Sequence, residues 1–268
     1  MSPRHACLEC LTRSPVATFE AALWIAVEHD PLVQPERILR QLRDLQLEVS
    51  LGLPMLPVSE LAQPLLRRLN TLGFQQDDFH PLRPQAGLLD KVLERKRGQS
   101  LALALIALEL ARRLDIPLVG VNFPGHFLLR VPGADHLLDP CGGRRLYPAD
   151  CRELLGRQFG PQVLLKAEHL LEASAVQMLQ RLSRNLRQLH ASHDNPIAAL
   201  KDAERVMALG PASVADYLAR AGLYQALECP QAERFDLEHA LLLTDDPIQR
   251  LRLTDRLHRL PVPVTVMH

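Results

Sequence analysis

Three residues in the middle of the chain have the types needed for a catalytic set. Ser100 begins a long apolar segment, His126 follows a Pro-Gly pair, and Asp139 precedes a proline. A serine hydroxyl can attack a carbonyl when a histidine removes its proton and a carboxylate orients that histidine. If Ser100 starts a helix, the free N–H groups of the first turn also lie where they can stabilise an oxyanion. The pattern indicates serine-dependent acyl transfer or hydrolysis.

The same residues also have structural interpretations. Serine is a preferred N-cap residue and needs no further role at a helix start. A single histidine beside a Pro-Gly pair is commonly a satisfied structural side chain. Spacing alone therefore leaves both interpretations of Ser100 and His126 open.

The segment that follows Ser100 predicts a buried helix. From Leu101 to Leu110 every residue except Glu109 is apolar. A buried strand is the rival interpretation, but the length and the alanine-leucine composition favour a helix. Because a helix that is apolar all round has no solvent-facing side, we expect it to run through the core.

Three short apolar segments after this helix predict strands, and they cover residues 116–122, 126–131 and 136–139. Pro132-Gly133 predicts a turn between the second and the third, which should form an antiparallel hairpin. With a loop of residues 132–133, the numbers of two opposed residues add up to 265, so His126 lies opposite Asp139. With a loop of residues 132–135 they add up to 267, so His126 lies opposite Cys141. Both registers place His126 and Asp139 on one face of the sheet.

Helices are expected on both sides of this region. Before it, helical spacing of apolar residues covers 17–27, 35–49 and 61–72, with Ser59 as the cap of the third, and a short charged helix is expected over 88–97. After Asp150 only helices are expected, over 170–190, 196–209, 212–227, 231–243 and 247–260.

In the C-terminal helices, two residue types also recur at nearly the same distance. Ala199 and Ala232 are 33 residues apart, and Pro211 and Pro247 are 36 apart, close to the 34-residue tetratricopeptide period. Ordinary antiparallel helix hairpins are the alternative.

Composition limits the fold class and the partners. The chain has 268 residues, of which 47% are hydrophobic and 4% aromatic, with 31 Lys plus Arg against 31 Asp plus Glu. The apolar residues are mostly Leu, Ala and Val, which favours an α+β fold that is mainly helical. Because there is no net positive charge to attract a polyanion, we expect no nucleic-acid partner.

The cysteines and the length of the apolar runs indicate the cellular compartment of the protein. An odd number of scattered cysteines predicts reduced thiols in a reducing compartment. The longest apolar run near the start, residues 21–27, is too short to cross a bilayer or to serve as a signal peptide. We therefore expect a cytoplasmic protein without a membrane partner. The five cysteines are Cys7, Cys10, Cys141, Cys151 and Cys229.

Other reactive side chains give weaker patterns. Cys7 and Cys10 form a C-x-x-C pair, but no second ligand pair follows, so we expect no metal, no cofactor and a frayed terminus. Cys141 lies in a turn after Asp139 and not at a helix start, where a thiol would be activated. Residues 98–102 resemble a nucleophile elbow, but the charged segment before them and the order Ser, His, Asp exclude an α/β-hydrolase.

The central sequence resembles a known bacterial family. The run GQSLALALIALELARRLDIPLVGVNFPGHFLLRV, followed by HLLDPCGG, is similar to the transglutaminase-like core of a Sir-B-type family. The segments AALWIAVEHDPLVQPERILRQL and RLSRNLRQLH extend the similarity over most of the chain. The resemblance implies a papain-like, transglutaminase-like domain with an N-terminal helical cap over residues 1–167. A tetratricopeptide-like tail would follow over residues 168–268.

The resemblance also implies roles for the three residues. In transglutaminases a nucleophilic cysteine starts the central helix, seventeen residues before a proline that matches Pro117, and this position is Ser100 here. The family's histidine and aspartate map onto His126 and Asp139. Because a serine hydroxyl is far less acidic than a thiol, Cys-dependent crosslinking should be absent. The remaining functions are a module that binds a protein or peptide, which we favour, and a serine acyl-transferase or amide hydrolase.

Overall fold

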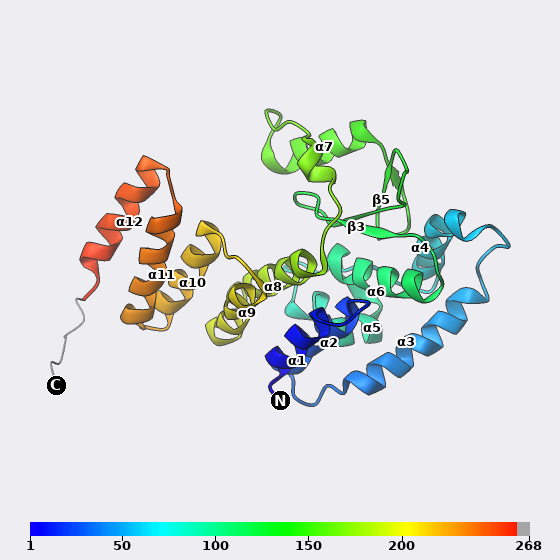
Figure 1. The fold of residues 1–268 in the computed structure, drawn as a ribbon, viewed down its shortest axis with the longest axis horizontal. Coiled ribbons are helices and arrows are strands. Elements are labelled where there is room, and N and C mark those ends of the chain that lie inside the picture. Colours follow the sequence, from blue (N-terminus) through cyan, green and yellow to red (C-terminus); the bar gives the residue numbers. More distant parts are fainter. Residues whose placement is uncertain (262–268) are drawn as a thin grey trace. The chain divides into compact units, whose positions relative to one another are not determined.

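The chain forms two compact units, residues 1–182 and residues 183–268 (Figure 1). The computed structural model describes residues 1–261, so the last seven residues of the predicted tail lie outside the described residues. The predicted domain boundary at residues 167/168 stays a prediction. The protein is mainly helical with a small antiparallel sheet, as the composition indicates.

The first unit is built around α6 (Ser100–Arg113). Each residue from Leu101 to Ala107 is at most 3% exposed, so the prediction of a helix that runs through the core is confirmed. Figure 1 shows this helix surrounded by other helices, of which four contact it. These four are α2 (Thr18–His29), α3 (Pro35–Ser50), α4 (Ala62–Thr71) and α5 (Leu89–Arg95).

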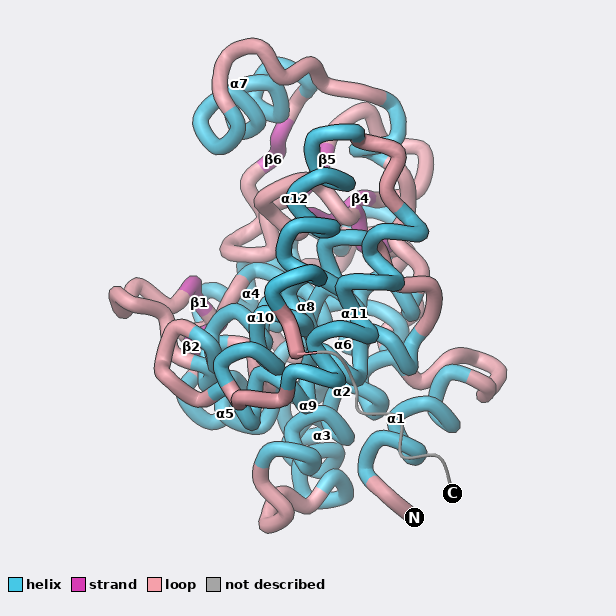
Figure 2. Tube along the Cα trace, turned by 90° about the vertical axis from the view of Figure 1, so that its left-hand side faces the viewer, coloured by secondary structure: helices cyan, strands magenta, loops and turns pink. Residues whose placement is uncertain are grey.

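A four-stranded sheet also packs against α6. The strand order is β3-β4-β5-β6, with every pair antiparallel. Leu128 and Leu137 pack on one face with Cys151 and Leu155 of α7 (Pro148–Phe159), and Figure 2 shows α7 beside β6. Side chains alternate along a strand, so the neighbouring residues face α6. The strands are β3 (Val119–Val121), β4 (Leu128–Arg130), β5 (Leu137–Leu138) and β6 (Arg145–Leu146).

The pairing of β4 with β5 selects one of the two predicted registers. Leu129 pairs with Leu138, and these positions sum to 267, the value expected for a loop of residues 132–135. Gly133 in this loop has a φ of 84°, in the left-handed region that favours glycine. The register brings His126 and Asp139 to the same end of the hairpin, away from its turn.

Residues 170–173 run along the outer side of β3. The Ala173 N–H donates to the Gly120 carbonyl at 2.8 Å, and Glu172 forms an antiparallel bridge with Val121. Arg130 Nη1 donates to the Leu170 carbonyl at 3.0 Å. The segment just before α8 (Ala175–Ala191) is therefore part of the first unit.

The expectation of a frayed N-terminus is wrong. Residues Pro3–Leu11 form α1, and Ser2 Oγ caps it by accepting from the His5 N–H at 3.2 Å. Cys7 and Cys10 are 1% and 0% exposed in this helix, which packs on α2. Burial raises the pKa of the Cys10 thiol to about 11. The C-x-x-C pair serves as small apolar side chains in the core.

Several short elements have no counterpart in the sequence prediction. They are α7, β6 and the parallel pair of β1 (Gln75–Gln76) with β2 (Arg97–Gly98). The expectation that Ser59 caps the third helix is also wrong, because Ser59 lies in a 3-10 turn and α4 begins without a side-chain cap. Two-residue strands fall below the length at which alternation can be recognised.

The second unit contains the end of α8 and four further helices. The predicted helix over residues 196–209 coincides with α9, and those over 212–227, 231–243 and 247–260 agree within two residues at each end. The prediction of a helix over 170–190 is wrong at its start, because α8 begins at Ala175 and the residues just before it pair with β3. A core of Ala221, Leu237 and Leu253 joins the last three helices. Among the described residues, no helix has the length and apolarity needed to cross a membrane. The helices are α9 (Pro196–Leu209), α10 (Val214–Ala226), α11 (Pro230–Leu243) and α12 (Pro247–Arg259).

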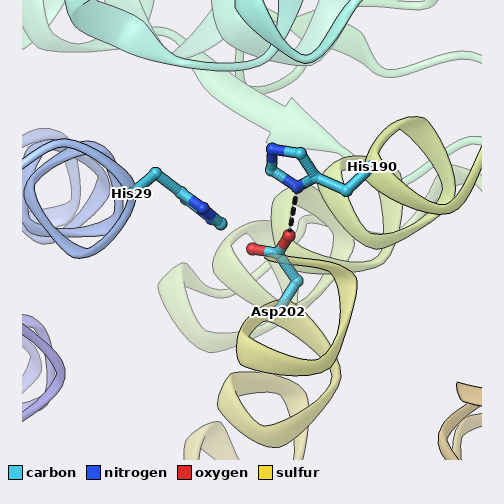
Figure 3. Close-up of side chains that lie close together, drawn as sticks. All are labelled: His29, His190 and Asp202. Atoms are coloured by element: carbon cyan, nitrogen blue, oxygen red, sulfur yellow. Dashed lines mark hydrogen bonds and ion pairs between the residues drawn. The ribbon is translucent and has the colours of Figure 1, made fainter. Parts of the chain in front are cut away.

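Buried hydrogen bonds and ion pairs also hold the helices of the second unit. His190 Nδ1 lies 2.7 Å from Asp202 Oδ2, as Figure 3 shows, and Arg205 Nη1 donates to Asp202 Oδ1 at 2.6 Å. Arg184 of α8 donates to both carboxylate oxygens of Asp216 on α10, at 2.8 Å each. A buried charge is tolerated only when it is paired, so these contacts fix which helices pack together.

Candidate functional site

Ser100 is the first residue of α6 and is positioned by the strand before it. β2 pairs with β1, and the Gln99 N–H donates to the Ala86 carbonyl at 2.7 Å. The N-cap is Gln99 and not Ser100, so the interpretation of Ser100 as a cap is wrong. Its half-buried hydroxyl forms no hydrogen bond within residues 1–261 and lies at the positive end of the helix.

Gly98 lets this strand lie close to α5. A Cβ at this position would lie 2.8 Å from both γ carbons of Val92. We expect Gly98→Ala to destabilise the protein by about 1–3 kcal/mol, because packed atoms would have to move, and urea denaturation measures this loss. The control is Gly156→Ala in α7, where a Cβ would meet nothing within 4 Å and stability should be kept. Equal losses in the two variants would contradict the packing argument.

His126 lies in the connection between β3 and β4. Gly125 has a φ of 75°, and a Cβ there would overlap the Gln158 amide, so the turn before His126 requires glycine. Phe123 and Phe127 are fully buried on either side, whereas His126 is half-buried. The prediction that His126 and Asp139 share one face of the sheet assumed that His126 lies in a strand. Because β4 begins only at residue 128, the alternation of side chains does not determine where His126 points.

Arg181 of α8 holds the same connection, although no sequence motif marks this residue. Its Nη1 donates to Asn122 Oδ1 at 2.5 Å and to the Phe123 carbonyl at 2.7 Å. Its guanidinium carbon also lies 5.8 Å from the centre of the Phe127 ring. No carboxylate of the described chain pairs with Arg181, and burial lowers its pKa to about 10. The partners are 58 and 59 positions away, so no local pattern could reveal the contact.

Removing this guanidinium should loosen the connection that carries His126. We expect Arg181→Met to speed amide hydrogen exchange over residues 122–127 by roughly tenfold or more, because each hydrogen bond from a charged group contributes about 1.5–3 kcal/mol. Exchange measured by mass spectrometry gives the result. Arg40→Met, at an exposed position on α3, is the matched control and should change nothing in these residues. Unchanged exchange in Arg181→Met would show that Arg181 does not hold them.

Asp139 directly follows β5, and its carboxylate bonds within its own turn. Its Oδ1 accepts from the Cys141 N–H at 2.8 Å, and its backbone N–H donates to the Arg144 carbonyl at 2.9 Å. Burial, with a smaller effect from the Asp139 carboxylate, raises the pKa of the Cys141 thiol to about 12. Cys141 therefore stays protonated at neutral pH and does not supply the missing thiolate.

Helix α4 links the Asp139 turn to the segment before Ser100. Gln63 Nε2 donates to the Gly143 carbonyl at 2.8 Å, and Asn70 lies against Gly142. The chain then leaves α4 and forms β1, which pairs with β2 just ahead of Ser100. The turn after Asp139 and the start of α6 are thus both attached to one helix.

The fold supplies the three groups of the predicted set from three different elements. Helix α6 presents a hydroxyl and open N–H groups, the β3–β4 connection an imidazole, and the turn between β5 and β6 a carboxylate. Within the described chain, no hydrogen bond joins His126 to Ser100 or to Asp139. A catalytic role for Ser100, His126 and Asp139 stays a prediction.

Comparisons with known proteins agree with this fold. The chain is 60% identical to UPF0162 protein PA3419 of Pseudomonas aeruginosa over 266 residues, which cover 99% of this chain and 98% of the relative. It is 36% identical to a UPF0162 protein of Xylella fastidiosa over 68% of this chain and 65% of that relative. Protein SirB1 of Salmonella typhimurium is 29% identical over 61% of this chain and 62% of SirB1, in accord with the Sir-B-type resemblance.

The family assignment rests on the region that contains all three predicted site residues. The sequence profile of the transglutaminase-like superfamily matches residues 36–184, from α3 into α8. This range includes the buried helix, the sheet and the helix α4 that links them. The chain belongs to the transglutaminase-like superfamily.

Proposed function

We propose that this chain is a transglutaminase-like module that binds a protein or peptide without crosslinking it. The observation that carries the proposal is a serine at the start of α6, whose hydroxyl forms no hydrogen bond to a histidine in the described chain. Crosslinking by a transglutaminase needs a thiolate, and a serine hydroxyl needs a base in contact with it. Without either, the site offers shape and hydrogen-bonding groups.

The helices of the second unit support a binding role. Ala199 lies on α9 and Ala232 on α11, while Pro211 precedes α10 and Pro247 begins α12. The two residues of each pair therefore belong to helices that are two apart in the chain, as expected for a repeat that consists of two helices. We propose that these helices form a short tetratricopeptide-like array, whose stacked pairs present an extended binding surface.

Two variants at one position test whether the α6 site binds the partner. Affinity capture with the full chain identifies a candidate, and titration with the purified candidate then compares wild type, Ser100→Ala and Ser100→Trp. Ser100→Ala keeps the shape of the site and should bind as the wild type does. Ser100→Trp fills the site and should weaken binding tenfold or more. Binding that is lost in Ser100→Ala, or kept in Ser100→Trp, would contradict the proposal.

Serine-dependent acyl transfer is the second candidate function. It is favoured by one observation, that Ser100 is half-buried at the helix start but does not cap the helix. Its mechanism would use Ser100 as nucleophile, His126 as base and Asp139 to orient the imidazole, with N–H groups of the first turn at the oxyanion.

A fluorophosphonate probe separates the two functions. If the serine is active, mass spectrometry of the full chain should find the label on Ser100, and His126→Ala should lose it. Folded wild-type protein that takes no label would support the binding module. Incorporation of a fluorescent amine into casein should be absent with the wild type in either case, because the nucleophilic thiol is missing.

A further inference from the structure

A small cavity lies on the α7 side of the sheet, beside the β4–β5 turn. Its volume is about 70 Å³. Apolar side chains from several segments make most of its wall, and three polar residues complete it. The apolar residues are Ala134, Leu137, Leu146, Pro148, Cys151 and Leu170, and the polar residues are Arg130, Asp135 and His136.

Arg130 brings a half-buried positive charge to this cavity, and no carboxylate of the described chain forms an ion pair with it. Its Nη1 donates to the Leu170 carbonyl at 3.0 Å, which is its one hydrogen bond from the side chain within residues 1–261. Its Nε is buried and has no hydrogen-bond partner. The guanidinium therefore has a hydrogen-bonding group left for an acceptor in the cavity, and an anionic oxygen is the acceptor that such a cation binds most strongly.

The acidic residue of the cavity wall, Asp135, already contacts the imidazole of His136. Its Nδ1 lies 2.9 Å from Asp135 Oδ1, and its ring packs against Tyr147 with centroids 5.5 Å apart. The Asp135 side chain is 85% exposed, whereas that of His136 is 16% exposed. The Asp135 carboxylate therefore borders the cavity but is mostly in water, and the guanidinium of Arg130 and the imidazole are the polar groups of the less exposed wall.

The lining selects a ligand with one charge and a short apolar part. One water molecule needs about 10–15 Å³ of such cavity volume, so about 70 Å³ admits a ligand of roughly five non-hydrogen atoms. Leucine walls disfavour phosphate, whose two charges carry a large hydration shell. A carboxylate on a two- or three-carbon chain meets both conditions, because its oxygens fit the planar guanidinium and its carbons fit the leucines.

We propose that this cavity binds a short aliphatic monocarboxylate and that Arg130 recognises its carboxylate. The proposal does not depend on the reactivity of Ser100 or on a partner at the α6 site. It assigns the first unit a small-molecule site on the sheet face opposite α6.

Titration of the full chain with sodium propionate tests the proposal by NMR of leucine methyl groups. We expect saturable shifts at Leu137 and Leu146, with a dissociation constant on the order of 1–10 mM for a ligand of five non-hydrogen atoms. Propionamide has the same shape without the charge, and phosphate has charge without the carbon chain. Neither should give saturable shifts at these positions. This comparison uses the wild type alone and does not depend on how a variant folds.

Variants then test the role of Arg130. Arg130→Met should weaken propionate binding at least tenfold, and Arg130→Lys, which keeps the charge, should weaken it less. Arg145→Met, at an exposed position on β6, is the matched control and should bind as the wild type does. Thermal unfolding confirms that each variant is folded. Equal shifts with propionamide, no saturation up to 100 mM propionate, or unchanged binding in folded Arg130→Met would each overturn the proposal.

Discussion

Replacing Ser100 by cysteine should create the most reactive thiol in the chain. At pH 7 we expect iodoacetamide to alkylate Cys at this position roughly tenfold faster or more than Cys229, which is the exposed natural cysteine. The reason is that the start of α6 stabilises a thiolate, and the thiolate is the nucleophile. Cys7, Cys10 and Cys151 are buried, and Cys141 stays protonated, so they should not compete. Peptide mass spectrometry at short reaction times measures both rates.

The contribution of His126 is measured in the same assay. If the imidazole contacts this position, Ser100→Cys combined with His126→Ala should react more slowly and shift the pH dependence of alkylation to higher pH. Equal rates in the single and double variants would assign the activation to the helix alone. A single variant that reacts no faster than Cys229 would contradict activation at the start of α6.

The largest stability change is expected from Asp216→Asn. Asp216 is 2% exposed and accepts from two nitrogens of Arg184 and from the N-cap Ser213. Breaking a buried ion pair costs about 3–5 kcal/mol, and because Arg184 is 34% exposed we expect a smaller loss, about 2–3 kcal/mol. Hydrogen exchange of the α10 amides reports this loss for the second unit separately.

The same pair makes the second unit sensitive to acid. Burial alone would raise the pKa of Asp216, but the hydrogen bonds from Arg184 and Ser213 outweigh it and hold the pKa well below its ordinary value. A carboxyl whose pKa is lower in the folded state stabilises that state above the unfolded pKa of about 3.9. The stabilisation is lost as the pH falls below about 4 towards the folded value. Asp216→Asn should remove this part of the acid sensitivity.

An exposed pair provides the matched control for Asp216. Asp255 and Arg259 form an (i, i+4) ion pair on α12, with side chains 59% and 77% exposed. Asp255→Asn should change stability by less than about 0.5 kcal/mol, because water screens an exposed pair. A loss in Asp216→Asn no greater than in Asp255→Asn would contradict the importance of the buried pair.

Long elements with a clear pattern of apolar residues could be predicted from the sequence. The all-apolar segment after Ser100 forms the buried helix, and the helix over residues 196–209 has the expected bounds. The β4–β5 register was one of two that the Pro-Gly turn allows. In each case the signal is local, because the period of the side chains or the length of the loop determines the structure.

The features that sequence reasoning missed depend on distant partners. The first residues show no extended apolar pattern and predict a frayed terminus, although the spacing of Ala6, Cys7 and Cys10 gives helix α1 one buried face. Arg181 reaches a loop almost sixty positions away, and only the folded chain brings them together. Any contact among Ser100, His126 and Asp139 would be of the same long-range kind, which is why spacing alone left their role open.

The strip of chain along β3 matters for any attempt to dissect this protein. A fragment that stops at residue 167 would lack the Ala173 N–H that occupies the Gly120 carbonyl and the residue that bridges Val121. A strand whose edge N–H and C=O groups are unpaired can pair with strands of other molecules, so such a fragment should aggregate in solution. Truncations meant to isolate the sheet therefore need to retain residues 170–173 to stay monodisperse.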